Sequence, residues 1–220
     1  MIWKKPSEAE KIIYFVRHGQ SEDNISPVFQ SAESPLSLHG KEQAKIVAKR
    51  VAKIDFDVLL SSTFPRAKET AQAISETTGK EPEYTDLFVE RIKPAEIGGK
   101  SLDDEEAKKV SKAWNDSLHN GAPRVPGGEN FEDIVARADK ALQYLMDRPE
   151  KRIVVVTHGY FLRTMIARIM LGDSLTQANF KSFQSHAEIE NTGLTVIIHQ
   201  ETYMANGWHL WIYNDHSHLG

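Results

Sequence analysis

The 220-residue sequence contains no cysteine. This absence excludes disulfide bonds, thiolate nucleophiles and metal sites with cysteine ligands. It also agrees with a reducing compartment, so we expect a cytoplasmic protein. The amino-terminal sequence MIWKKPSEAEK lacks the apolar core of a signal peptide, and we expect no such peptide.

Long apolar runs and a net positive charge are missing too. No apolar run exceeds about six residues, whereas a membrane-spanning helix needs roughly 20. The 31 acidic residues outnumber the 27 basic ones, which gives a net charge of −4. We therefore expect neither nucleic acid nor a membrane as a partner. The length and the ordinary apolar content of 40% fit one domain, residues 1–220.

Short apolar segments alternate with helical patterns, which is typical of a mostly parallel sheet flanked by helices. The segments expected to form strands are 12–16, 58–61, 153–157, 193–199 and 208–213. Helical patterns lie near 39–53, 65–78, 102–119, 131–146 and 160–170. No helical pattern separates the last two strands, so we expect an antiparallel edge. The predicted fold class is α/β, a three-layer α/β/α sandwich.

The region of about 88–130 is the least regular, with KPAEIGGKS and NGAPRVPGGEN on either side of one helix. We predict a helical insertion that forms a lid over a strand end, within the same domain. The last strand, GWHLWIY, is unusually apolar for an edge strand. We expect it to be covered or to pair between the subunits of a homodimer.

Three of the expected strands lead into arginine, histidine or glycine. These residues are Arg17, His18 and Gly19 after the first strand, Arg66 after the second, and His158 and Gly159 after strand 153–157. Singly, each is more often a structural or solvated residue than a functional one. Because ligands bind beyond the carboxyl ends of parallel strands, the recurrence predicts one site with two arginines and two histidines.

Two arginines and two histidines without a thiol indicate phosphoryl transfer. The planar guanidinium fork suits phosphoryl oxygens. A neutral imidazole can carry a phosphoryl group covalently, and a second histidine can donate to its oxygens. The chain contains no GxxxxGK[ST] sequence, so a nucleotide-binding P-loop is not expected.

The segment FVRHGQSEDN, residues 15–24, resembles the signature of the histidine phosphatase superfamily, the phosphoglycerate-mutase-like proteins. Four further segments resemble motifs of that family in the same order: PLSLHGKEQA (35–44), LSSTFPRAKETA (60–71), PGGEN (126–130) and VVTHG (155–159). The resemblance extends over most of the chain. It implies the family's α/β fold and its phosphohistidine chemistry.

The resemblance implies a role for each matching position. His18 matches the nucleophile, and Arg17, Arg66 and His158 match the residues of the phosphate pocket. The predicted substrate-binding residues are Ser21 and Asn24 of the loop after the nucleophile, Gly159 and Arg91. No metal and no cofactor are implied.

The family's proton donor is a carboxylate in a Leu-x-Glu segment, which Glu90 matches with phenylalanine in the place of leucine. Here the sequence departs from the family, because Pro94 and Ile97 replace a glycine and a glutamate. Asp86 and Glu96 are therefore competing candidates for the acid. Two nearby guanidinium groups are expected to lower the pKa of His18, and bound phosphate to raise the pKa of Glu90.

The predicted function is hydrolysis of a phosphomonoester, a small phosphorylated metabolite, through a phosphohistidine on His18. The segment ERIKPAEIGGKS differs from the "ERHYGALQG" that is usual in the glycolytic mutases, which favours a phosphatase over a cofactor-dependent phosphoglycerate mutase. A non-catalytic phospho-ligand-binding protein and a metallohydrolase are further alternatives. Residues of the insertion available to contact the substrate are Phe88, Arg91, Lys93, Lys100, Trp114 and Arg124.

Overall fold

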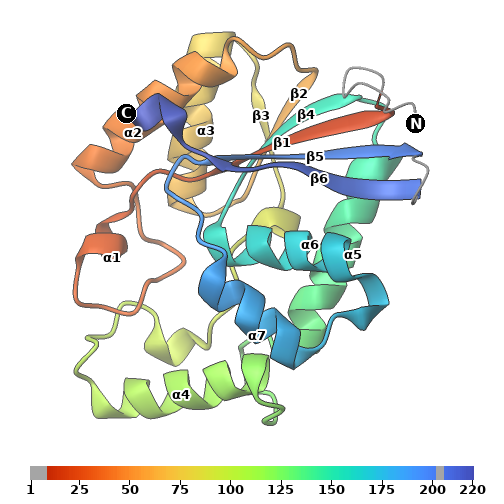
Figure 1. Ribbon diagram of the computed structural model, residues 1–220. Helices are drawn as coiled ribbons and strands as arrows, with labels where there is room; N and C mark the ends of the chain where they lie inside the picture. Colours follow the sequence, from red (N-terminus) through yellow and green to blue (C-terminus); the bar gives the residue numbers. More distant parts are fainter. Residues whose placement is uncertain (1–8, 202–205) are drawn as a thin grey trace.

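The computed structural model describes residues 9–201 and 206–220, which form a six-stranded sheet with helices on both faces (Figure 1). The strands are β1 (Lys11–Arg17), β2 (Val58–Ser61), β3 (Pro82–Tyr84), β4 (Arg152–Thr157), β5 (Leu194–Glu201) and β6 (Asn206–Asp215). Their order is β3-β2-β4-β1-β5-β6. The first four are parallel, while β5 and β6 pair antiparallel. The predicted fold class and antiparallel edge are confirmed.

Helices occupy both sides of this sheet. They are α1 (Glu22–Ile25), α2 (Leu38–Val51), α3 (Pro65–Thr78), α4 (Glu105–His119), α5 (Phe131–Asp147), α6 (Gly159–Leu171) and α7 (Gln177–His186). Short 3₁₀ turns are η2 (Asp86–Phe88), η3 (Ala95–Ile97), η4 (Gly172–Ser174) and η5 (Ser217–Leu219). Helices α2 and α3 cover one face and α5 and α6 the other, with α7 and α4 farther from the sheet (Figure 1). No helix in the described ranges has the length and apolarity to cross a membrane.

Alternate residues of the central strands build two separate cores. In β1, Ile13 and Phe15 pack on the side of α5 and α6, while Ile12 and Val16 pack on the side of α2 and α3. Strand β4 alternates in the same way. A strand that is buried on both faces is apolar throughout, and this explains the continuous run at 12–16.

The predicted insertion forms η3, α4 and the loops around them. Helix α4 begins at Glu105 and not at Leu102, because the side chain of Asp104 accepts a hydrogen bond from the Ala107 amide and caps the helix. The buried Trp114 ties α4 to the following loop, since its indole donates to the Glu129 carbonyl at 2.8 Å. In the edge strand β6, Trp208 packs against the core, whereas Trp211 is 45% exposed.

Candidate active site

The strand register brings the predicted residues together. Arg17, at the end of β1, lies beside Thr157, at the end of the neighbouring β4, and the chain then continues into His18 and His158. The two imidazole rings lie 4.9 Å apart between centroids. Arg66 reaches the same place from the start of α3. Two arginines and two histidines thus meet at the carboxyl edge of the sheet.

His18 is buried, with 1% of its surface exposed. The Nε of Arg66 donates to its Nε2 at 3.2 Å, so Nε2 carries a lone pair and no proton. The other nitrogen, Nδ1, then carries the proton and donates to the Gly19 carbonyl at 2.6 Å. Burial, with the charges of Arg66 and Arg17, holds the pKa of His18 well below its ordinary value. The arrangement describes a neutral imidazole with a nucleophilic Nε2.

The backbone after His18 passes very close to another segment. A Cβ atom on Gly19 would lie 2.5 Å from the carbonyl oxygen of Gly40, and one on Gly40 would lie 1.9 Å from that of Gln20. No side chain fits these gaps, so both positions require glycine. The glycine of the 35–44 segment therefore supports the turn that follows the nucleophile.

The two arginines are held by carbonyl groups. The Nη1 of Arg66 donates to the carbonyls of Ser31 at 3.0 Å and Ala32 at 3.2 Å, and burial lowers its pKa to about 10. Arg17 donates to the Ile189 carbonyl, its buried Nε has no partner among the described residues, and burial lowers its pKa. Within the described chain neither forms an ion pair with a carboxylate. Their charges are thus available to an anion.

His158 is fully buried on the other side of His18. Its Nε2 and the Ser62 hydroxyl lie 2.7 Å apart, and its Nδ1 has no partner among the described residues. Burial and the charge of Arg66 hold its pKa well below the ordinary value. The ring of Phe64 packs against it edge-on, at 5.3 Å between centroids. His158 is neutral, and one ring nitrogen is free to bind a ligand.

Glu90 lies at the amino terminus of α6. Its carboxylate accepts from the amides of Phe161 at 3.0 Å, Tyr160 at 3.3 Å and Arg91 at 3.1 Å. Burial raises the pKa of Glu90, but Arg91, Arg66 and these amides outweigh it and leave the pKa below its ordinary value. Without a ligand, Glu90 is ionised.

A buried ion pair supports the loop that carries Glu90. Arg137 of α5 makes two 2.7 Å bonds to Glu129 and donates to the carbonyls of Val89 at 2.8 Å and Glu90 at 3.2 Å. Glu129 also accepts from the Ile92 amide at 2.8 Å. The PGGEN segment thus supports the loop that carries Glu90 through Glu129, without contributing to the two histidines or two arginines itself. Arg137 was not predicted, because its loop partners are backbone carbonyls about 50 residues away.

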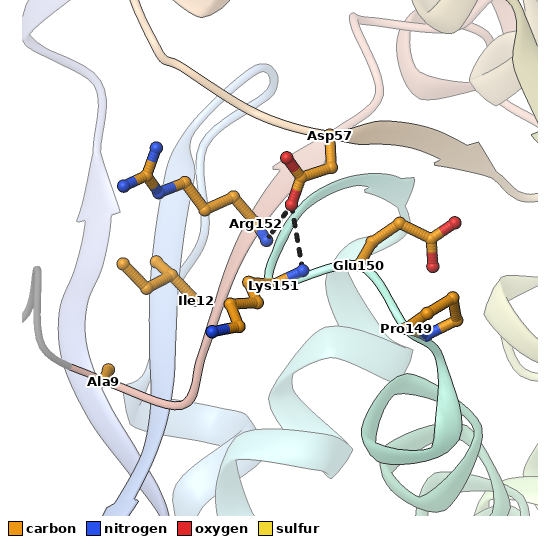
Figure 2. A pocket seen from close by; sticks show the side chains of 7 residues that line it. All are labelled: Ala9, Ile12, Asp57, Pro149, Glu150, Lys151 and Arg152. Atoms are coloured by element: carbon orange, nitrogen blue, oxygen red, sulfur yellow. Dashed lines mark hydrogen bonds between the residues drawn. The ribbon is translucent and has the colours of Figure 1, made fainter.

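Two cavities open at this edge, with volumes of about 320 and 300 Å³. Gln30, Glu90, Arg91 and Lys93 line both. Arg17 and Gly159 line the first cavity, and Arg66 and Phe64 line the second. His18 and His158 line neither cavity, although Arg66, which contacts His18, lines the second. A larger cavity of about 750 Å³ lies elsewhere, beside residues 149–152 at the start of β4 (Figure 2).

The predicted substrate-binding residues differ in their positions. The guanidinium of Arg91 stacks between the rings of Trp114 and Tyr160, 4.5 and 4.3 Å from their centroids. The Ser21 hydroxyl is buried and accepts from Gln30, which lines both cavities. Asn24 is exposed and accepts from the Ser21 amide at 2.9 Å, outside both linings. These roles stay predictions.

The competing acids lie outside the two cavities. Glu96 is exposed, and Asp86 is exposed and bonded to the Thr63 hydroxyl. Lys100 and Arg124 likewise line neither cavity, whereas Lys93 lines both. The burial of Lys93 lowers its pKa to about 8. In residues 9–201 and 206–220, no group of three or more His, Cys, Asp or Glu side chains is placed to hold a metal ion.

Comparisons with known proteins agree on one family. The family model described as histidine phosphatase superfamily (branch 1) matches residues 13–215. Proteins named probable phosphoglycerate mutase GpmB are 29% identical over 220 residues in Photorhabdus laumondii and 27% over 216 residues in an Enterobacter species. Each of these alignments covers 94% of both chains.

Solved structures show the same fold. The alpha-ribazole phosphatase of Shigella flexneri superposes with a TM-score of 0.75 at 20% identity, covering 93% of this chain and 96% of that chain. A mycobacterial glucosyl-3-phosphoglycerate phosphatase in complex with VO3 gives a TM-score of 0.73 at 24% identity, covering 93% and 99%.

Proposed function

The chain belongs to the histidine phosphatase superfamily (branch 1), and from this premise we propose that it hydrolyses a phosphomonoester through a phosphohistidine on His18. The hydrogen bond from Arg66 Nε to His18 Nε2 carries the proposal, because it requires a lone pair on Nε2. This lone pair lies close to two guanidinium groups that have no carboxylate partner among the described residues. Such groups can bind a phosphoryl group in front of Nε2, where the lone pair can attack phosphorus.

Binding of the phosphoryl group must first release this lone pair. In the free protein the Arg66 donor occupies Nε2, and His18 lines neither cavity. A phosphate dianion attracts the donors of Arg66 and Arg17 more strongly than a neutral imidazole does. When Arg66 turns to the phosphate, Nε2 becomes free on the side where the phosphorus arrives.

The first step forms the bond between Nε2 and phosphorus and breaks the bond from phosphorus to the leaving oxygen. Glu90, in its protonated form, gives its proton to that oxygen. The helix amides favour the ionised carboxylate, so the phosphate dianion beside it must raise the pKa of Glu90 for this step. The bond from His18 Nδ1 to the Gly19 carbonyl stabilises the imidazole as it gains positive charge.

The second step returns the histidine to its starting state. Water attacks phosphorus, Glu90 takes up its proton, and the bond between phosphorus and Nε2 breaks. His158 and the two arginines bind the phosphoryl oxygens in both steps. Inorganic phosphate then leaves. These steps consume one water molecule and need only the side chains of this chain.

A phosphoglycerate mutase is the second candidate, because the relatives at 27–29% identity carry that name. The segment after Glu90, ERIKPAEIGGKS, departs from the usual mutase sequence and supports the phosphatase. A protein that only binds phosphorylated ligands has no need of a neutral, oriented nucleophile. Retained activity in EDTA would speak against a metallohydrolase.

The proposal is tested by turnover of p-nitrophenyl phosphate and by trapping of the phosphoenzyme with an alkaline denaturing quench, in which the nitrogen–phosphorus bond of a phosphohistidine survives. We expect labelled phosphate on His18 and none on the His18→Gln variant, which should lose at least about a thousandfold in turnover. Isomerisation of 3-phosphoglycerate, faster than its hydrolysis, would assign the mutase. A wild-type protein that binds phosphate and turns over neither substrate would overturn both.

A further inference from the structure

The turn before β5 bonds to the backbone of the nucleophile. The side-chain amide of Asn191 donates to the His18 carbonyl at 2.9 Å. The Thr192 amide donates to the Arg17 carbonyl at 3.0 Å, and the Arg17 amide donates to the Gly193 carbonyl at 3.2 Å. Asn191, Thr192 and Gly193 line neither cavity.

Thr192 has an unfavourable backbone conformation, with a φ of 61°. A β-branched residue in this left-handed region is strained, because its side chain crowds the neighbouring backbone. The conformation directs the amide of Thr192 towards the end of β1, and its hydroxyl donates to the Asn191 carbonyl at 2.6 Å. Strain of this kind persists where the surrounding bonds determine the geometry, and it is frequent at functional sites.

The His18 carbonyl belongs to the peptide that joins His18 to Gly19. The other side of this peptide, the Gly19 amide, donates to the Thr70 hydroxyl at 3.1 Å. Thr70 lies on α3 and bonds to the Arg66 carbonyl at 2.8 Å. The peptide is therefore held from α3 on one side and from the turn before β5 on the other.

Rotation of this peptide would turn the imidazole. His18 Nδ1 bonds to the carbonyl of the next residue, Gly19, and glycine restricts the backbone less than any other residue. Without the bond from Asn191, the His18 carbonyl keeps only a longer hydrogen bond, from the Thr192 amide at 3.4 Å. Nε2 would then point towards Arg66 for a smaller fraction of the time. In the complex with substrate, it would likewise be aligned with the phosphorus atom less often.

We propose that Asn191 is a positioning residue: through the His18 carbonyl it fixes the direction of the nucleophilic Nε2, assisted by the strained backbone of Thr192. The proposal rests on the function proposed above for His18. Asn191 touches no reacting atom, so its contribution reaches the reaction only through the orientation of the imidazole.

The test compares Asn191→Leu, which removes the donor at similar size, with Asn120→Leu, the same change at the exposed end of α4. Loss of an outer support of this kind typically costs 10- to 100-fold in activity. We expect kcat of Asn191→Leu to fall by about that factor, with KM within about twofold, because the arginines that bind phosphate are unchanged. Asn120→Leu should match the wild type.

A second readout is independent of turnover. Nitrogen-15 NMR of the histidine rings should show a single Nδ1–H tautomer for His18 in the wild type and a mixture in Asn191→Leu. Wild-type kcat in Asn191→Leu, or a raised KM with unchanged kcat, would overturn the positioning role. If the wild type has no turnover, the function of His18 fails, while the NMR comparison still decides the role of Asn191.

Discussion

The two ends of the parallel strands differ in the surroundings of their charged side chains, which are exposed and paired at one end and buried at the other. At the start of β4, Asp57 accepts from the amides of Lys151 at 2.9 Å and Arg152 at 2.8 Å (Figure 2). The side chain of Arg152 pairs with the exposed Asp55. Lys151 extends into solvent. The cavity there, at about 750 Å³, is the larger one.

At the carboxyl ends the guanidinium groups of the two arginines are buried, and no carboxylate of the described residues lies within ion-pair distance of them. Arg66 and Arg17 bond to carbonyls and to an imidazole, and no carboxylate in the described chain pairs with them. The two cavities there measure about 320 and 300 Å³. Volume alone would therefore favour the end opposite to the candidate site. Buried guanidinium groups without a carboxylate partner favour the candidate site as a place for an anion.

The largest effect is expected from Glu90→Gln, which removes the proton donor and keeps the shape of the side chain. Turnover of a phosphomonoester with a poor leaving group should fall about 100- to 10,000-fold. The loss should be smaller for p-nitrophenyl phosphate, whose leaving group needs little protonation. Steady-state kinetics on the two substrates measure this difference.

Two exposed carboxylates supply the controls for Glu90. Glu96→Gln tests the competing acid near the cavities, and Asp55→Asn tests a carboxylate at the opposite end of the strands. Both variants should keep wild-type kcat. Loss of turnover in Glu96→Gln with retained turnover in Glu90→Gln would transfer the role to Glu96.

The next prediction concerns stability and compares a buried ion pair, Arg137–Glu129, with an exposed one, Arg152–Asp55. The side chains of Arg137 and Glu129 are 12% and 8% exposed, whereas those of Arg152 and Asp55 are 40% and 86% exposed. Glu129→Gln leaves a buried charge uncompensated and should lower the free energy of unfolding by about 3 kcal/mol. Asp55→Asn should lower it by less than about 1 kcal/mol. Equal losses in urea unfolding would contradict this contrast.

The smallest effect is a dependence of stability on pH at the site end. The pKa values of His18 and His158 lie well below the ordinary value in the folded protein, so below about pH 6.5 the unfolded chain binds more protons. Stability is full above that pH and falls below it, by at most about 1.4 kcal/mol per pH unit for each histidine.

Urea unfolding at pH 7.5, 6.5 and 5.5 measures this dependence. His158→Gln removes one of the two groups, so its stability should fall less steeply with acid than that of the wild type. Lys151→Gln changes a charge at the other end and should leave the slope unchanged. Parallel pH curves for the wild type and His158→Gln would show that His158 takes up a proton as readily in the folded protein as in the unfolded chain, which would contradict the lowered pKa.

The sequence predicted the strands whose ends carry chemistry, because an apolar run that stops at arginine and histidine is unusual. It did not predict β3 or α7. Strand β3 is only Pro82-Glu83-Tyr84, without a buried residue. Helix α7 buries just Phe180 and Gln184, too few for a visible apolar period. Both elements exist because neighbouring segments provide pairing and packing partners.

In the candidate site, the convergence of two arginines and two histidines at one edge of the sheet was predictable from the residue types. The residues that orient them were not. Asn191 and Thr192 follow an irregular segment, and their role depends on β5 pairing beside β1. A run of turn residues, NTG, directly before a strand was the only signal in the sequence. Contacts between segments more than 170 residues apart leave no local pattern.

The close passage of Gly19 and Gly40 has a consequence for recognising relatives of this protein. Neither position accepts a side chain, because each Cβ atom would collide with the backbone of the opposite segment. The two glycines are 21 residues apart in the sequence, but they meet the same steric requirement and can be treated as one motif. A search pattern that requires the Arg-His-Gly tripeptide together with a glycine in the first turn of the helix equivalent to α2 should reject many chance tripeptides.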